Sequence, residues 1–296
     1  EVLDGVRRGH HVSEVVESTK RAKDAGLKVC YHIMPGLPGS TREKDLRSFR
    51  RLFEDPDFRP DMLKIYPTLV VKGTGLYDSW SKGEYAPLTE DEGVALVAEM
   101  KSMVPPWVRI LRIQRDIPAG LIEAGIRKGH LRELVAERMA DDGRRCACIR
   151  CREVGHMNVP AGGDEEPTMK SIPYEASGGK EIFVSFESGH ESSLVGYARL
   201  RLPGDDGSSA ALVRELHVYG QMVPIDAGPG LNWQHRGYGE RLLAECERLA
   251  CAEGRSEIMI TSGVGVRGYY RSLGYELRGH YMAKYLSGTG RDAMII

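Results

Sequence analysis

The sequence predicts a mixed α/β chain in two parts, and three observations lead to this expectation. A length of 296 residues is enough for about two domains. Up to residue 118, helix-like segments alternate with short apolar strands, which is the pattern of parallel β/α units. After residue 160, strand-like segments separated by Gly, Ser and Asp turns dominate. We therefore expect an open half of a β/α barrel followed by an α+β domain.

Three helices and three strands are expected in the first part: helices over residues 13–25, 41–53 and 91–103, and strands over residues 27–34, 62–67 and 108–113. Gly26 is typical of a helix C-terminus, and the proline and glycine residues of 35–39 end the first strand. Active sites of β/α barrels gather at the C-terminal ends of the strands. Residues 34–39 and 66–75 are therefore candidate site segments.

The pattern changes after residue 119. Residues 121–139 are expected to be mostly helical, interrupted by Gly125 and Gly129, and residues 160–167 form a loop by composition. The second part should contain strands over residues 181–187, 194–202, 211–219 and 256–261, and a helix over residues 240–247. We expect three segments, with the bounds 1–118, 119–157 and 158–296.

Composition and charge are those of a soluble globular protein. No apolar run approaches the roughly 20 residues that cross a bilayer, and no signal peptide is visible. Membrane association is therefore not expected, and a cytoplasmic location is. The six cysteines should be reduced thiols. The net charge of −1 does not indicate nucleic-acid binding by the chain as a whole.

Positive charge is nevertheless concentrated in one stretch. Residues 101–152 hold twelve basic residues against six acidic ones. Such a region suits a polyanion. A solvated helical surface with some salt bridges explains the same pattern equally well.

Cys146, Cys148 and Cys151 place three thiols within six residues. Thiolates repel each other unless a metal neutralises them, so the pattern C-x-C-x-x-C favours zinc or an iron–sulfur cluster. Three reduced surface thiols are the alternative without a metal. His130, His156 or water could supply the fourth ligand. The spacing differs from the C-x-x-x-C-x-x-C of radical S-adenosylmethionine enzymes, so their catalytic cluster is not expected here.

A glycine turn leads into the helix expected in the second part. Residues 234–239 contain Q-x-x-G-x-G and follow an expected strand. Glycines allow close approach of the backbone, and the N–H groups and dipole of a helix start attract an anion such as a pyrophosphate. An ordinary loop-to-helix turn is the alternative. With the next strand and Y-Y-x-x-L-G-Y at 269–275, this order resembles the Gcn5-related N-acetyltransferases. The resemblance implies acetyl-CoA on the turn.

Motifs in both parts resemble the Elongator catalytic subunit family. They are Y-H-I-M-P-G-L-P-G (31–39), L-K-I-Y-P-T-L-V (63–70), R-I-Q-R-D-I-P (112–118), R-E-V-G (152–155), R-E-L-H-V-Y-G (214–220) and S-G-V-G (262–265), followed by Tyr269-Tyr270. The resemblance covers nearly the whole chain in order. It implies a partial radical-SAM β/α barrel half followed by a Gcn5-related (GNAT-type) acetyltransferase domain.

The resemblance also implies an activity. The family modifies tRNA, starting carboxymethylation at carbon 5 of the wobble uridine, and uses acetyl-CoA, S-adenosylmethionine and a [4Fe–4S] cluster. This sequence starts at Glu1 without the N-terminal cysteines of that cluster. We therefore expect a fragment without the radical step that retains tRNA-stimulated acetyl-CoA hydrolysis. tRNA is the expected partner, and a homodimer and other Elongator-type subunits are both left open.

Residue roles follow from the same resemblance. The residues expected to bind acetyl-CoA are Leu216, His217, Val218, Gln234, His235, Arg236, Gly237, Tyr238, Gly239 and Tyr270. The candidate catalytic residues are Tyr269, Tyr270 and His217. A phenol near the sulfur could protonate the leaving thiolate or orient the acetyl group. His217 and its neighbour Glu215 are candidates for a base, with packing or capping as the alternative for both. Helix packing is the alternative for one of the two tyrosines. The expected tRNA contacts are Lys64, Arg109, Arg112, Arg115, Lys128, Arg144, Arg145, Arg150 and Arg152.

Two other function classes stay open. One is a protein lysine acetyltransferase, which uses the same acetyl-CoA fold with a peptide as acceptor. It leaves the barrel half and the basic segment without a purpose. The other is a non-catalytic RNA-binding scaffold that retains acetyl-CoA as a structural ligand.

Overall fold

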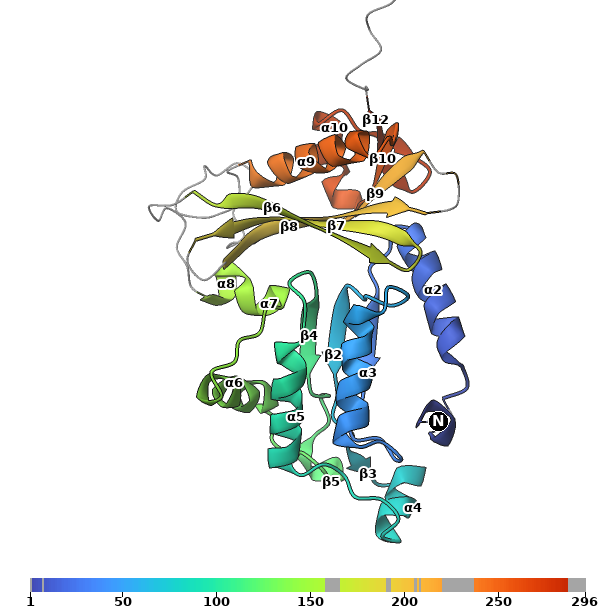
Figure 1. Ribbon diagram of the computed structural model, residues 1–296, viewed down its shortest axis with the longest axis vertical. Coiled ribbons are helices and arrows are strands. Elements are labelled where there is room, and N and C mark those ends of the chain that lie inside the picture. The colour runs from blue at the N-terminus through green and yellow to red at the C-terminus, as the bar shows by residue number, and fades with distance from the viewer. Residues whose placement is uncertain are drawn as a thin grey trace, which may run out of the picture. The chain divides into compact units, whose positions relative to one another are not determined.

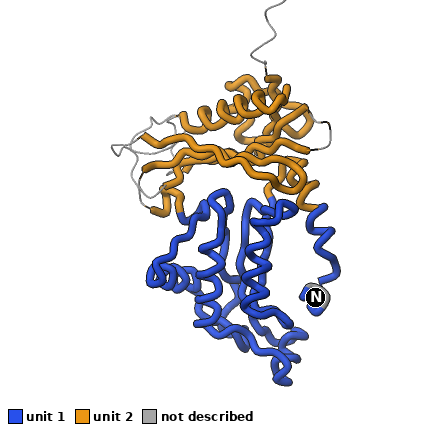
Figure 2. The backbone as a smooth tube through the Cα atoms, in the orientation of Figure 1, with its two compact units in different colours: residues 1–17, 29–151 blue, residues 18–28, 152–296 orange. Residues whose placement is uncertain are grey.

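The computed structural model describes residues 2–6, 8–157, 166–189, 193–204, 207, 209–219 and 237–286 (Figure 1). The chain divides into two compact units, unit 1 with residues 1–17 and 29–151 and unit 2 with residues 18–28 and 152–296 (Figure 2). Two of the three boundaries fall inside α2 (Val12–Asp24) and α7 (Ile149–Arg152), and the third lies between residues 28 and 29, after α2. Within the described ranges, no helix is long and apolar enough to cross a bilayer.

Unit 1 is built on a parallel three-stranded sheet in the order β1 (Cys30–Ile33), β2 (Met62–Ile65), β4 (Arg109–Ile113). Two helices, α3 (Arg42–Glu54) and α5 (Glu90–Ser102), cover one face of this sheet (Figure 1). The other elements are α1 (Val2–Gly5), β3 (Val70–Val71), α4 (Gly75–Ser81), the 3-10 turn η1 (Ala119–Leu121), β5 (Ile122–Ala124) and α6 (Leu131–Asp141). The expected half of a β/α barrel is confirmed, as are its three helices and three strands.

Local chemistry explains where the covering helices begin. The hydroxyl of Thr41 accepts from the Lys44 amide at the start of α3, and Thr89 and Glu92 form a capping box at the start of α5. Both devices satisfy amide groups that have no partner inside the helix. The apolar faces of the two helices, with Phe49 and Leu96, then join one core with Leu63 of β2.

The expectation of helix over residues 121–139 is wrong for its first part. Residues 122–124 form β5, which pairs with β3, and α6 begins only at Leu131. Gly125 has a φ of +103°, and an added Cβ there would lie 3.2 Å from the carbonyl oxygen of Thr68. A helix cannot adopt that backbone, so the chain turns at this glycine before α6 starts.

Unit 2 contains a seven-stranded sheet in the order β11-β12-β10-β9-β8-β7-β6. Its strands are β6 (Thr168–Ala176), β7 (Gly179–Ser188), β8 (Ser193–Pro203), β9 (Ala210–Val218), β10 (Glu257–Thr261), β11 (Glu276–Arg278) and β12 (Tyr281–Tyr285). Neighbouring strands are antiparallel except β9 and β10, which are parallel. Parallel neighbours need a crossover connection, and α9 (Tyr238–Ala252) lies between them in the chain.

The strands expected over residues 181–187, 194–202, 211–219 and 256–261 are confirmed, and so is the helix over residues 240–247. β6, β11 and β12 go beyond the expected strands. The remaining elements of unit 2 are α8 (Val154–Met157), the 3-10 turn η3 (Val264–Val266) and α10 (Arg267–Ser272).

Buried ion pairs hold residues 18–28 on the sheet of unit 2. Arg201 of β8 and Arg214 of β9 both donate to the fully buried carboxylate of Glu181 on β7, at 3.1 and 2.8 Å. Arg201 also donates to Asp24 at 2.7 Å, and Arg214 donates to the carbonyl oxygen of Leu27 at 2.8 Å. Buried arginines on two strands thereby hold Asp24, which is itself 22% exposed, and the chain that follows α2.

Candidate functional site

The glycine turn before α9 is described from Gly237 onward. Gln234, His235 and Arg236 lie outside the described residues. Gly237 has a φ of +77° and precedes the first helical residue, Tyr238. An added side chain at Gly237 would meet nothing within 4 Å. Among the described residues nothing occupies the space beside Gly237, and the first amides of the 15-residue helix α9 have no carbonyl acceptor inside the helix.

A gap between two strands lies beside this turn. β10 pairs with β9 only as far as Val213, whereas β9 continues to Val218 and keeps its pairing with β8. Within the described ranges, the edge of β9 that carries residues 214–218 has no partner strand beyond Val213. Leu216, His217 and Val218 lie on this edge. Amide groups of a ligand could pair with such an edge as an added strand does.

Tyr269 of α10 connects the turn with the end of β9. An added Cβ at Gly239 would lie 3.2 Å from the Tyr269 hydroxyl oxygen and 3.7 Å from the Val218 side chain. A side chain at position 239 would therefore require the Tyr269 hydroxyl to shift by a few tenths of an ångström. The helix start, the phenol and the unpaired strand edge therefore converge on one place in unit 2.

The two adjacent tyrosines occupy different environments. The Tyr269 side chain is 42% exposed, whereas Tyr270 is 6% exposed and packs edge-on against Tyr275. Burial raises the pKa of Tyr269 and, next, the nearby Glu240 carboxylate adds to the shift. Burial also raises the pKa of Tyr270, to about 12. Both phenols are therefore protonated at neutral pH, but Tyr269 is the one with access to a ligand.

The neighbouring candidates on β9 differ in how exposed they are. His217 is exposed, with its ring centroid 4.4 Å from that of Tyr219. Glu215 binds Arg199 and Lys28, at 2.9 and 3.0 Å. Burial would raise the pKa of Glu215, but these two cations outweigh it and hold the pKa below its ordinary value. Glu215 is thus an occupied structural carboxylate, and His217 is the more accessible of the two.

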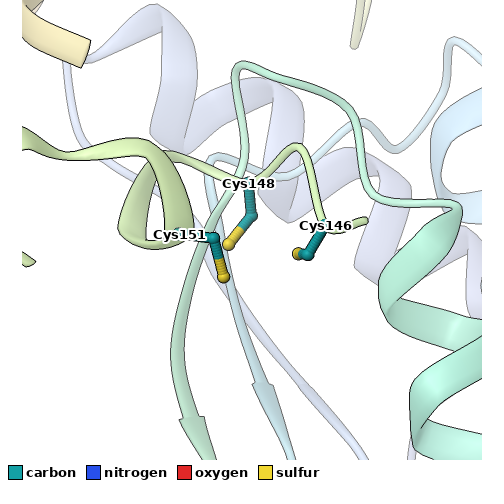
Figure 3. A group of neighbouring side chains, drawn as sticks. All are labelled: Cys146, Cys148 and Cys151. Carbon is teal, nitrogen blue, oxygen red and sulfur yellow. The ribbon is translucent and has the colours of Figure 1, made fainter. Parts of the chain in front are cut away.

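The three clustered cysteines of unit 1 form a compact group. Cys148 is fully buried, Cys146 and Cys151 are partly buried, and the three sulfur atoms lie within 4.8 Å of one another. Figure 3 shows the three sulfurs directed toward a common space. Four ligands around zinc at about 2.3 Å would place neighbouring sulfurs about 3.8 Å apart. The cysteine group is therefore compact enough to hold zinc.

Thiol chemistry within the cysteine group agrees with a metal. The thiols of Cys146 and Cys151 donate to the sulfur of Cys148, which holds the pKa of Cys148 well below its usual range. Neither histidine considered as the fourth ligand belongs to the group among the described residues. His156 instead contacts Glu153 at 2.7 Å, and His130 is exposed at the start of α6.

A row of basic side chains crosses the open face of the sheet in unit 1. His32, Lys64 and Arg112 are in register on β1, β2 and β4. Burial, with the cations of Lys64, Arg8 and Arg115, lowers the pKa of His32. The row lies near the C-terminal strand ends, where barrel active sites gather. It is positioned to face an anionic ligand.

An open basin of about 580 Å³ lies at the C-terminal end of β4. We call it the arginine basin; the charged and amide residues in its lining are Arg112, Gln114, Arg115, Asp116, Arg127, Arg132, Glu133 and Arg150. Burial, together with the nearby cation of Arg150, lowers the pKa of Arg132. The basin is therefore a place where positive charges are held close together.

The expected tRNA contacts are only partly brought together. Arg112, Arg115 and Arg150 meet in the arginine basin, while Lys128 pairs with Glu90 at 2.6 Å. The others outside the basin and the basic row are Arg109, Arg144 and Arg145, of which the last two are exposed. Arg152 is 8% exposed and binds Glu187 at 2.9 Å. It is a structural cation of unit 2, so we leave it out of the proposed phosphate contacts.

Two arginines and one amide of the lining lie outside the sequence-based set of tRNA contacts. Arg127 and Arg132 belong to the basic stretch but could not be told from its solvated arginines, and Gln114 carries no charge. A sequence signal that could have singled out Arg132 is its position on α6 near two apolar residues that are buried in the structure, Leu131 and Val135. Gln114 follows directly after β4, a position typical of functional residues in β/α units.

Comparison with known proteins identifies relatives for both units. Residues 60–141 match the Radical_SAM C-terminal domain family. The tRNA uridine(34) acetyltransferase of Methanocaldococcus jannaschii is 48% identical over 97% of this chain and 55% of its own length. Human Elongator complex protein 3 is 44% identical over 97% of this chain and 54% of its own length. The solved structure of Methanocaldococcus infernus Elp3 with an N-terminus deletion (1–46) matches with a TM-score of 0.89 and 46% identity, covering 96% of this chain and 69% of that chain.

The chain belongs to the Elongator complex protein 3 (Elp3) family. Its match to the archaeal Elp3 structure covers nearly the whole chain, so the resemblance inferred from the motifs and the mixed α/β fold class are both confirmed. The chain spans about half the length of the curated Elp3-type relatives it matches. The match to the Radical_SAM C-terminal domain family at residues 60–141 falls within unit 1.

Proposed function

We propose that this chain carries the acetyl-CoA-dependent half of wobble-uridine carboxymethylation of tRNA. Unit 2 binds acetyl-CoA, unit 1 binds tRNA, and tRNA stimulates hydrolysis or transfer of the acetyl group. The names of two relatives, tRNA uridine(34) acetyltransferase and Elongator complex protein 3, support the substrate class. The observation that carries the acetyl chemistry is the convergence of the Tyr269 hydroxyl, Gly239 and the end of β9.

Each part of this convergence has a role toward acetyl-CoA, which when bound supplies an activated acetyl thioester. The open start of α9 directs amide groups and the helix dipole at the pyrophosphate. The unpaired edge of β9 offers N–H and C=O groups to the amides of the pantetheine arm. Tyr269, protonated at neutral pH, donates a hydrogen bond to the acetyl oxygen or a proton to the departing thiolate. Tyr270 packs behind it and positions its ring.

In unit 1 the basic row and the arginine basin are the proposed surface for tRNA phosphates. Cations that contact phosphates supply affinity without reading sequence. The cysteine group holds one zinc ion in this proposal, as a structural site of the basic segment. Full-length members of the family would bring S-adenosylmethionine and a [4Fe–4S] cluster. The cysteines of this chain do not have the spacing of that cluster, so we assign no ligand of it here. A tRNA substrate is consistent with the cytoplasmic location that we propose.

Coenzyme A release tests the function and separates it from the alternatives. We expect slow release from acetyl-CoA that rises when tRNA is added. Transfer to histone-type peptides, with no response to tRNA, would indicate a protein lysine acetyltransferase. Binding of tRNA without any release would indicate a scaffold.

The acetyl-CoA turn is tested with a matched pair of glycines at the two ends of α9. Gly237→Glu places a negative charge where the pyrophosphate is proposed to sit, and each lost charge-assisted hydrogen bond makes affinity fall at least about tenfold. Gly254→Glu is the control, because Gly254 has a φ of +73° and open space around it but lies at the other end of the helix. Equal calorimetric affinities in both folded variants would remove the assignment of the turn.

A further inference from the structure

A neutral hydrogen-bond acceptor, the side-chain oxygen of Gln114, lies among the arginines of the arginine basin, which also holds the carboxylates of Asp116 and Glu133. The side-chain oxygen of Gln114 is buried and has no hydrogen-bond partner among the described residues. A buried polar atom without a partner is costly, so native examples call for an explanation. An N–H or O–H donor of a bound molecule would satisfy this oxygen.

The backbone at Gln114 is also unusual. Its φ is +153°, one of three positive values among the described residues other than glycine. Such strain persists where the surrounding structure imposes it, and it clusters at ligand sites. Residue 114 follows β4 directly, and Ile113 before it is buried. The fold therefore holds this amide at a fixed place on the wall of the basin.

The lining of the arginine basin carries more positive than negative charge, with five arginines against two acids. Arg112 pairs with Asp116. Arg132 donates to the carbonyl oxygens of Ile110 and Leu111, at 3.5 and 3.3 Å. The lining also holds Arg115, Arg127 and Arg150, with Glu133 as its second acid. Cations held together in this way repel one another, and an anion relieves that repulsion.

We propose that the arginine basin seats one nucleotide of a single-stranded RNA loop. Its phosphate contacts Arg115, Arg127 and Arg150, and a base N–H or a ribose 2′-OH donates to the Gln114 oxygen. The inference rests on the proposed tRNA function and adds to it a subsite with a residue that selects its occupant. Gln114 thereby reads a feature that the arginines cannot.

Chemistry favours a nucleotide over a simple anion. Inorganic phosphate satisfies the guanidinium groups, but its remaining P–OH is the only kind of donor that it can offer to the Gln114 oxygen. A nucleotide carries phosphate oxygens and donor groups in one rigid body. The basin's volume of about 580 Å³ lies within the roughly 300–1,000 Å³ that is usual for small-ligand sites. Loops of RNA expose unpaired bases that can be splayed into such a site.

The test measures fluorescence anisotropy of a labelled RNA stem-loop with the intact chain. Gln114→Met keeps the length of the side chain and removes the acceptor, and one lost hydrogen bond should weaken binding roughly 2- to 10-fold. Arg150→Gln should reduce the salt dependence by about one phosphate. Arg50→Gln on α3, an exposed arginine outside the basin, is the matched control and should do neither.

A series of stem-loops, each with one abasic or one 2′-deoxy loop position, distinguishes recognition from a structural role. If Gln114 contacts one nucleotide, removal of that base or of its 2′-OH should weaken RNA binding by the native chain. The native chain should then bind that stem-loop no more tightly than Gln114→Met does. With changes at all other loop positions, the native chain should still bind more tightly than Gln114→Met. Such non-additivity is the signature of direct contact. If Gln114→Met does not fold, Gln114→Asn replaces it, because the shorter side chain withdraws the same oxygen.

Three results would overturn the nucleotide seat while RNA binding itself persists. Gln114→Met could bind every stem-loop as tightly as the native chain, or lose the same factor on all of them. A polyglutamate peptide could displace the RNA from both proteins at one concentration, which would indicate an unspecific anion surface. Failure of the native chain to bind any stem-loop or tRNA would instead remove the proposed function.

Discussion

Replacement of Glu181 by glutamine should open the sheet of unit 2. The Glu181 side chain is fully buried and accepts from two guanidinium groups, those of Arg201 at 3.1 Å and Arg214 at 2.8 Å. Glutamine keeps the shape of the side chain but removes the charge. The oxygen of glutamine still accepts a hydrogen bond from one arginine, but its NH2 group would face the N–H groups of the other arginine. The two buried guanidinium charges would then lack the negative charge that now neutralises them.

The structure sets the size of this effect. Removing one partner of a buried ion pair costs about 3–5 kcal/mol. Asp24 remains bound to Arg201, and the Leu27 carbonyl remains bound to Arg214. Because these contacts persist, we expect the lower end, about 3 kcal/mol. A change of that size corresponds to an opening equilibrium shifted roughly 100-fold.

The matched control is Glu253→Gln. Glu253 pairs with Lys180 at 2.5 Å, but the two side chains are 39% and 33% exposed. An exposed pair contributes about 0–1 kcal/mol, so the same chemical change should be nearly silent.

Hydrogen exchange measured by mass spectrometry follows the opening of β7, β8 and β9 directly, which avoids assuming a two-state transition in a chain of two units. Amides of these strands should exchange about 100-fold faster in Glu181→Gln. Native-like protection in Glu181→Gln, or equal losses in both variants, would refute the reasoning about the buried carboxylate.

Three further predictions concern acid, metal and catalysis. In unit 2, burial alone would raise the pKa of Glu187, but its contacts with Lys170 and Arg152 outweigh burial and lower it below 4.5. Its stabilising contribution should therefore be present above about pH 4.5 and lost as the pH falls through the lower folded value. Acid denaturation should be less steep in Glu187→Gln, and an identical profile would contradict this. The purified chain should contain one zinc per molecule by elemental analysis. Cys148→Ser should lose the zinc and destabilise unit 1. A zinc content below about half an equivalent would mean that the three thiols do not form a metal site. Tyr269→Phe should slow coenzyme A release about 100-fold with little change in acetyl-CoA affinity, whereas Tyr270→Phe should act less. Full turnover in Tyr269→Phe would return that tyrosine to packing.

Local patterns in the sequence determined much of the fold. The helices over residues 41–53 and 91–103 were predictable because helix-forming segments between strands are local signals, and the structure shows threonine caps at Thr41 and Thr89 that reinforce their starts. The same holds for the cysteine group, since three thiols within six residues cannot move far apart. The stretch after Leu121 failed because helix-forming composition does not register the backbone that Gly125 adopts or the pairing of β5 with β3.

Tertiary structure decided which of several similar residues have which role. Tyr269 and Tyr270 are equivalent in sequence, but α10 buries one and brings the hydroxyl of the other to Gly239. Arg152 and Arg150 belong to the same basic run, yet one is fixed by Glu187 and the other lines the arginine basin. The physical reason is that burial and pairing depend on groups far away in the chain. A sequence fixes the charges and hydroxyls that are available, and only packing determines which of them meet a partner inside the protein and which remain open to a ligand.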